Sequence, residues 1–206
     1  MIISVIDYGM GNLRSVTKAL KRLGAEPRLV KTPAEVNSAD GLILPGVGSF
    51  AKGMENLGAA GWSAFLHEWK AAGKPLLGIC LGMQLLAEKG TEGGETNGLG
   101  LVKGTVRRFE VDEKKFKVPH VGWDNAAAID KRMFKGVPDG AAFYFIHSYH
   151  LVADARAVAA RCVYGEEFCA AVREGSVWGT QFHPEKSQKA GLRVLENFLN
   201  ECGGAP

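Results

Sequence analysis

The sequence predicts an α/β fold with a doubly wound, mostly parallel sheet flanked by helices and an additional antiparallel β portion in the C-terminal half. In residues 1–90, short apolar runs alternate with stretches of helical period, as in successive βα units. After residue 100, short β-type segments follow one another. With 206 residues, 46% of them hydrophobic, the chain is expected to form one domain spanning 1–206.

The first half of the chain is expected to alternate strands and helices, because β-branched runs and 3.6-residue periodicity take turns along it. Glycine-rich turns separate these segments, and strands joined by helices are expected to be parallel. The expected elements are a strand at 2–6, a helix through Val16, Leu20 and Leu23, strands at 26–30 and 41–44, helical structure over 51–72, a strand at 76–79 and a helix over 83–89.

The second half begins after a glycine-rich loop at 91–100 and is expected to be more antiparallel, because no helical stretch separates its strands. These strands are expected at 102–111, 118–123, 142–146, 158–163, 169–173 and 177–181, with a closing helix at 187–201.

Charge and targeting signals favour no polyanionic partner. The net charge is only +3 and the basic residues are dispersed, so neither nucleic acid nor a membrane is an expected partner. The first residues lack the pattern of a signal peptide, and no apolar run reaches transmembrane length, so a cytoplasmic protein is expected. The four cysteines form no C-x-x-C pair, and therefore neither a metal site nor a disulfide framework is expected.

One cysteine, Cys80, has the setting of a nucleophile. Residues 78–82 read Gly-Ile-Cys-Leu-Gly where a strand meets a helix, and the glycines permit a sharp turn that exposes the thiol. The helix that follows favours the thiolate, and the N–H of Leu81 can hold an oxyanion. The alternative is a small buried hydrophobic residue, which is the interpretation kept for Cys162, Cys169 and Cys202.

A base and its partner are predicted at His183 and Glu185. Pro184 favours extended geometry for the residue before it, so residues two apart are expected to project to the same side. The carboxylate can then hold one imidazole nitrogen while the other faces the thiol. The alternative is a histidine with an incidental acidic neighbour, and His147 remains a rival for the role of base.

Three further features have both a functional and a structural interpretation. The loop at 45–48, Pro-Gly-Val-Gly, follows the third strand at the same sheet edge, where it is either a second oxyanion donor or a plain turn. Gln84, one helical turn beyond Cys80, either reaches a substrate amide or lies idle on the surface. Trp123 is either a core aromatic or part of an interface.

The segments LPGVGSF, GICLGMQLL and TQFHPEKS together resemble the class I glutamine amidotransferases. The segments DYGMGNLRSV, PHVGWD, FIHSYH and HPEKSQ are similar to those of the glutaminase subunits of imidazole glycerol phosphate synthases. Anthranilate and aminodeoxychorismate synthase subunits match these segments less well. One departure is Asp124, where the similar proteins usually have Asn.

The resemblance implies a glutaminase that needs no cofactor and passes ammonia to a (β/α)8-barrel cyclase subunit in histidine biosynthesis. It also implies roles for residues of this sequence: a Cys80, His183 and Glu185 triad, an oxyanion site at Val47 and Leu81, glutamine contacts at Gly48, Gln84, Ser148 and Tyr149, and a partner interface at Asn12 and Trp123. Two alternatives remain open, a cysteine hydrolase of peptides or γ-glutamyl chains and a non-catalytic regulatory module.

Overall fold

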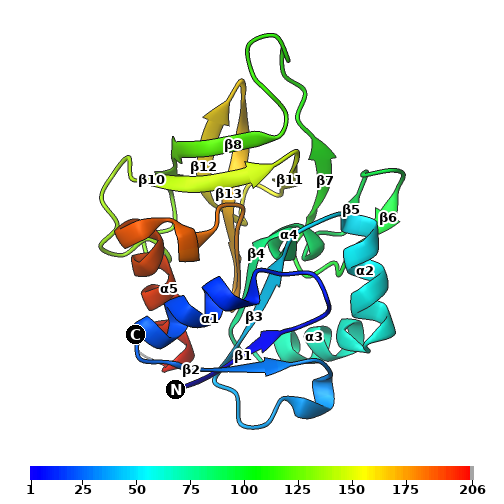
Figure 1. Cartoon of the computed structure of the whole chain (residues 1–206), viewed down its shortest axis with the longest axis vertical. Helices are drawn as coiled ribbons and strands as arrows, with labels where there is room; N and C mark the ends of the chain where they lie inside the picture. Colours follow the sequence, from blue (N-terminus) through cyan, green and yellow to red (C-terminus); the bar gives the residue numbers. More distant parts are fainter. Residues whose placement is uncertain (205–206) are drawn as a thin grey trace.

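The computed structural model describes residues 1–204, and the last two residues of the expected domain lie outside it. An eight-stranded sheet in the order β2-β1-β3-β4-β14-β13-β12-β9 runs through the molecule (Figure 1). Its strands are β1 (Ile2–Ile6), β2 (Glu26–Val30), β3 (Gly41–Gly46), β4 (Leu76–Cys80), β9 (Ala127–Ala128), β12 (Val158–Tyr164), β13 (Glu166–Glu174) and β14 (Val177–Thr180). The pairs from β2 to β14 are parallel and the remaining pairs antiparallel, as the sequence predicts.

Helices cover both faces of this sheet. The helices α1 (Leu13–Arg22) and α5 (Gln188–Cys202) pack on one core cluster, and α2 (Phe50–Ala59), α3 (Trp62–Ala71) and α4 (Leu81–Leu85) on the other (Figure 1). In α1 the buried side chains are Val16, Ala19 and Leu20, the i, i+3, i+4 spacing of an amphipathic helix. Within residues 1–204 no helix is long and apolar enough to cross a membrane.

Two small sheets lie beyond the upper end of the parallel strands (Figure 1). One pairs β8 (His120–Asn125) with β10 (Ala142–His147), and the other joins β11 (Tyr149–Ala153), β7 (Gly104–Arg108), β5 (Lys89–Gly90) and β6 (Thr96–Asn97). The polar segment at 147–149 comprises the last residue of β10, the connecting Ser148 and the first residue of β11.

Several expected elements differ from the structure. The helical stretch expected over 51–72 consists of two helices, because Gly61 adopts a left-handed conformation with φ +77° and separates α2 from α3. The helix expected at 83–89 begins and ends earlier, since Lys89 already pairs with β7. The strand β11 was not expected, and the strand expected at 102–111 is limited to β7.

The sheet edge at the carboxyl ends of the parallel strands collects the predicted site. Gly46, at the end of β3, lies opposite Cys80, at the end of β4. On the other side of β4, Thr180 of β14 lies opposite Ile79, so the chain that continues to His183 leaves from the same edge. Open α/β sheets bind their ligands at this edge, beside the point where the strand order reverses.

Candidate active site

The chain makes the sharp strand-to-helix turn at Cys80 that the sequence predicts. The two flanking glycines are needed there for a different reason from the expected one. Cys80 itself has φ 54° and ψ −111°, a conformation that L side chains rarely adopt. Neither Gly78 nor Gly82 has positive φ; both are required by space. A Cβ on Gly78 would lie 2.7 Å from backbone atoms of Gly82, and one on Gly82 would overlap the carbonyl oxygen of Leu44.

His183 and Glu185 form the predicted pair. Nδ1 of His183 lies 2.9 Å from Oε1 of Glu185, and their side chains are 2% and 0% exposed. The pairing does not come from strand alternation, because Glu185 lies in a 3₁₀ turn, Pro184–Lys186, that follows an extended His183. With Nδ1 held by the carboxylate, Nε2 is the free nitrogen, and it is buried without a hydrogen-bond partner in the described part of the chain.

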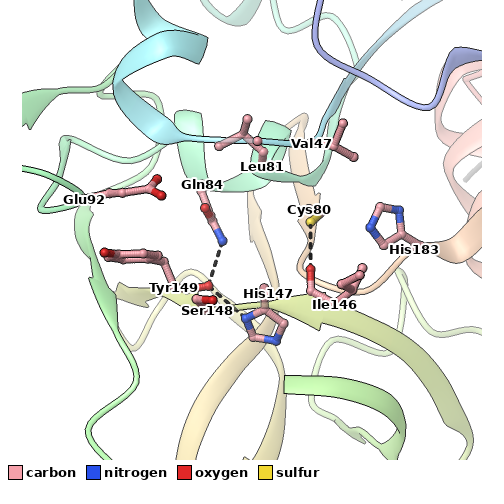
Figure 2. Close-up of a pocket in the computed structure, with 11 residues that line it drawn as sticks. Val47, Cys80, Leu81, Gln84, Glu92, Ile146, His147, Ser148, Tyr149 and His183 are labelled. Carbon is pink, nitrogen blue, oxygen red and sulfur yellow. Dashed lines mark hydrogen bonds between the residues drawn. The ribbon is translucent and has the colours of Figure 1, made fainter. Parts of the chain in front are cut away.

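The thiol of Cys80 and the imidazole of His183 face each other across one cavity (Figure 2). In this resting arrangement the thiol is directed at the carbonyl oxygen of Ile146, 3.8 Å away, and no hydrogen bond joins it to Nε2. Burial, the largest single influence, lowers the pKa of His183, but Cys80 and Glu185 together overcome it and raise that pKa to about 9. The rise reflects two acidic groups close to a buried imidazole.

The cavity has a volume of about 250 Å³, and all six of the predicted substrate and oxyanion residues line it. The predicted lining residues are Val47, Gly48, Cys80, Leu81, Gln84, Ser148, Tyr149 and His183. Three further residues line the cavity: Glu92, Ile146 and His147, of which the sequence points only to His147, as the rival base. Glu92 belongs to the glycine-rich loop at 91–100, and its only sequence signal is an acid among glycines.

Gln84 forms hydrogen bonds that connect residues on one side of the cavity. Its Nε2 donates to the carbonyl oxygen of Tyr149 at 2.8 Å (Figure 2). The same nitrogen donates to Oε1 of Gln181 at 3.0 Å. The same carbonyl of Tyr149 accepts a hydrogen bond from Nδ1 of His147 at 2.8 Å. Burial lowers the pKa of His147 to about 3, so this histidine is a neutral part of the wall and is poorly suited to serve as the base.

The two predicted interface residues lie outside the cavity. Asn12 precedes α1 and is partly exposed, whereas Trp123 on β8 is 46% exposed, with its ring 5.9 Å from that of Tyr144. The outward side chains of β8 and β10 form an apolar surface, here called the outer face: Val121, Trp123, Tyr144 and Ile146. Ile146 belongs both to this face and to the cavity.

The remaining cysteines and the acidic residues form no second centre. Cys162, Cys169 and Cys202 are unpaired thiols, and burial raises the pKa of each to about 12. In the part of the chain that the structure describes, no group of three or more His, Cys, Asp or Glu side chains is placed to hold a metal ion.

A nucleophilic elbow at the sheet edge, opposed by a buried His-Glu pair, is the constellation of a cysteine amidotransferase, and comparison with known sequences agrees. The family described as glutamine amidotransferase class-I matches residues 4–202, and the chain belongs to this family. It is 47% identical to imidazole glycerol phosphate synthase subunit HisH of Methanosarcina acetivorans, covering 97% of this chain and 98% of that protein. It is 49% identical to the subunit of the same name from Desulfitobacterium hafniense, covering 96% and 93%.

Solved structures give the same fold. A crystal structure described as a glutamine amidotransferase aligns with a TM-score of 0.77 over 98% of this chain and all of the other, at 24% sequence identity. At that identity the likeness concerns the fold alone.

Proposed function

We propose that the chain is the glutaminase subunit of imidazole glycerol phosphate synthase, which hydrolyses glutamine and delivers the ammonia to a cyclase subunit in histidine biosynthesis. The observation that carries this proposal is the meeting of Cys80 with the His183–Glu185 pair at one cavity. Similarity to the HisH subunits over nearly the whole chain supports it. The chain acts as one glutamine amidotransferase domain in the cytoplasm.

The reaction begins with proton transfer from the thiol of Cys80 to Nε2 of His183. The sulfur then attacks the side-chain amide carbon of glutamine, and the carbon–nitrogen bond breaks as His183 returns the proton to the departing ammonia. A γ-glutamyl thioester remains on Cys80. His183 next removes a proton from water, which attacks the thioester and releases glutamate, while Glu185 stabilises the imidazolium in both steps.

Two backbone N–H groups, those of Val47 and Leu81, hold the oxyanion of each tetrahedral intermediate. Both residues line the cavity beside the sulfur, and such a donor contributes about 3 kcal/mol to transition-state stabilisation. The amino-acid end of glutamine lies against the remaining walls, with contacts to Gly48, Gln84, Ser148 and Tyr149. Glu92 is the only carboxylate among the lining residues, so it provides the counter-charge for the α-ammonium group.

The partner is a (β/α)8-barrel cyclase that docks on the outer face, with Trp123 and Asn12 in contact. An exposed apolar surface of this kind marks a protein interface. Ile146 connects this surface to the chemistry, because its side chain is 41% exposed while its carbonyl oxygen accepts the resting Cys80 thiol. Binding of the cyclase at Ile146 can therefore change the orientation of the Cys80 thiol. Hydrolysis of glutamine is accordingly expected to be slow in the isolated subunit.

The proposal is tested by mixing the protein with a cyclase subunit and glutamine and following the release of glutamate. Turnover is expected to rise when the cyclase and its ligand are present and to vanish in Cys80→Ala, while the matched variant Cys162→Ala, at a buried cysteine outside the cavity, keeps it. Equal turnover with and without the liganded cyclase contradicts the partner. Fast cleavage of γ-glutamyl peptides by the isolated protein favours a cysteine hydrolase instead.

A further inference from the structure

A line of hydrogen bonds leads from the exposed strand β8 into the wall of the cavity. Its outer half starts at Asp124, whose Oδ2 lies 2.6 Å from Nε2 of His120. Nδ1 of His120 lies 3.3 Å from Nε2 of His147, because the register of β8 and β10 places these two histidines opposite each other. Nδ1 of His147 lies 2.8 Å from the carbonyl oxygen of Tyr149.

The inner half continues from that carbonyl through Gln84 and Gln181 to the nucleophile. Gln84 donates to the same oxygen at 2.8 Å and to Oε1 of Gln181 at 3.0 Å. Nε2 of Gln181 in turn lies 3.8 Å from the sulfur of Cys80. The position of the Tyr149 carbonyl therefore affects both the amide that lines the cavity and the neighbour of the sulfur.

All three contacts of the outer half can be hydrogen bonds at the same time only with one proton more than two neutral histidines supply. A carbonyl oxygen only accepts, so the proton of neutral His147 is on Nδ1 and its Nε2 is bare. The contact between the two rings is then made by a proton on Nδ1 of His120, which leaves Nε2 of His120 bare opposite a carboxylate. Two acceptors at 2.6 Å repel each other unless an additional proton lies between them.

We propose that Asp124 is a positioning residue of the glutamine site, because the Asp124–His120–His147 line holds the Tyr149 carbonyl fully only while one proton is shared between Asp124 and His120. This inference rests on the proposed function, since glutamine is taken to bind beside Tyr149. Asp124 is the entry point for the proton, as its side chain is 39% exposed whereas that of His120 is fully buried.

Loss of the shared proton breaks the hydrogen bond between His120 and His147. Only two protons are then available for the Asp124–His120, His120–His147 and His147–Tyr149 contacts. The negative charge of Asp124 favours the tautomer of His120 that carries its proton on Nε2. The bare Nδ1 of His120 is left facing the bare Nε2 of His147, so the hold of His147 on Tyr149 weakens. Glutamine therefore binds more weakly at pH values above this deprotonation and more tightly below it.

Other titratable groups lie near Asp124 and His120 but form no hydrogen bond with either of them in the described residues. Tyr164 stacks on His120 at 4.0 Å between ring centroids, but its hydroxyl donates to the carbonyl of Lys117. Near Asp124 lie the thiol of Cys162, whose pKa is raised first by burial and then by Asp124, and an ion pair between Arg161 and Glu167.

The histidines have further neighbours that set the direction of their titration. Burial lowers the pKa of His147 most strongly, and His120, His150 and His183 lower it further, against the effect of the Tyr149 carbonyl. His150 lies beside an Arg107–Glu166 ion pair. Burial also lowers the pKa of His120, and Asp124 opposes this effect without reversing it. The shared proton is therefore expected to leave at a pH below 6.5, the ordinary imidazole pKa.

The test compares the wild type with Asp124→Asn in the complex with the cyclase subunit, from about pH 5 to about pH 9, which spans histidine titration. The Asn amide donates to Nε2 of His120 with a proton that does not titrate, so the line stays closed at every pH. The two proteins are expected to have equal KM for glutamine at the acid end. At the alkaline end the KM of the variant is expected to be about 5- to 10-fold lower, the effect of one hydrogen bond.

The control is Asp139→Asn, which removes one exposed negative charge from a pocket that Asp139 shares with Trp123. Its KM ratio to wild type is expected to be the same at every pH. Effects of His183 and the thiol cancel in such ratios, because all three proteins share them. A KM ratio for Asp124→Asn that does not change with pH overturns the proposal.

An NMR measurement on the isolated full chain separates this inference from the proposed function. Nitrogen-15 spectra are expected to show His120 protonated on Nδ1 at low pH and on Nε2 at high pH in the wild type, and on Nδ1 throughout in Asp124→Asn. A wild-type His120 protonated only on Nε2 at all pH values overturns the proton line. If the complex fails to hydrolyse glutamine, the proposed function fails, and the spectra alone decide the proton line.

Discussion

Replacement of Glu185 by Gln isolates the charge that supports the base. The amide has nearly the same shape and can still accept from Nδ1 of His183, so the position of the ring is kept while the negative charge is lost. Both side chains are almost completely buried, and Oε2 of Glu185 has no hydrogen-bond partner in the described region, so little else compensates for the loss of charge.

The magnitude follows from the geometry of the pair. A hydrogen bond to a charged group contributes about 1.5–3 kcal/mol, and a contact of 2.9 Å shielded from water belongs in the upper half of that range. A loss of about 2–3 kcal/mol from the transition state lowers kcat roughly 30- to 150-fold. Glu185 also raises the pKa of His183, so the alkaline limb of the rate profile is expected to move to lower pH.

The assay follows glutamate release by the complex at saturating glutamine. The control is Glu201→Gln, which removes a mostly buried acid paired with Arg132 at the end of α5, 2.9 Å apart and away from the cavity. This variant is expected to lose some thermal stability and to keep kcat within about twofold. A fall in kcat of less than about threefold in Glu185→Gln, with the fold intact, would refute the role assigned to the carboxylate.

Three further predictions concern the base, the elbow and the substrate pocket. The pKa of His183 in the folded protein is raised to about 9. Protonation of His183 therefore contributes to folding stability fully below the ordinary pKa of 6.5, and this contribution is lost as the pH rises through about 9. Urea unfolding should show this loss of stability in the wild type and not in His183→Asn. Gly82→Ala, which meets the Leu44 carbonyl, should cost about 1–3 kcal/mol of stability together with activity, whereas Gly58→Ala, in open space, should cost none. Glu92→Gln should raise the KM for glutamine about tenfold with little change in kcat, and an unchanged KM would exclude its contact with the ammonium group.

Much of the fold was predictable because local pattern and global fold agree in the parallel half. The strands β1 and β2 have the predicted ends, and the core stripe of α1 follows the expected spacing. The misses depend on tertiary context. Gly61 ends a helix only through its left-handed conformation, and β11 is a strand because it pairs with β7 over a distance that no local window spans.

In the candidate site, too, the features set by local sequence were predictable and those set by tertiary contacts were not. Motifs identify the elbow and the His183–Glu185 pair, because glycine, proline and a short spacing constrain the chain locally. They do not show that Nδ1 of His147 is occupied by the Tyr149 carbonyl, which removes this histidine from the candidate bases. The contact between His147 and His120 likewise depends on the register of two strands separated by a long connection.

The central claim is that the sulfur of Cys80 carries the γ-glutamyl group during turnover. Rapid acid quenching of the complex with glutamine, followed by intact-mass measurement and peptide mapping, tests it most directly. We expect a γ-glutamyl adduct on the peptide containing Cys80, absent from Cys80→Ala. Glutamine turnover without any adduct, or an adduct on Cys162, Cys169 or Cys202, would contradict the account.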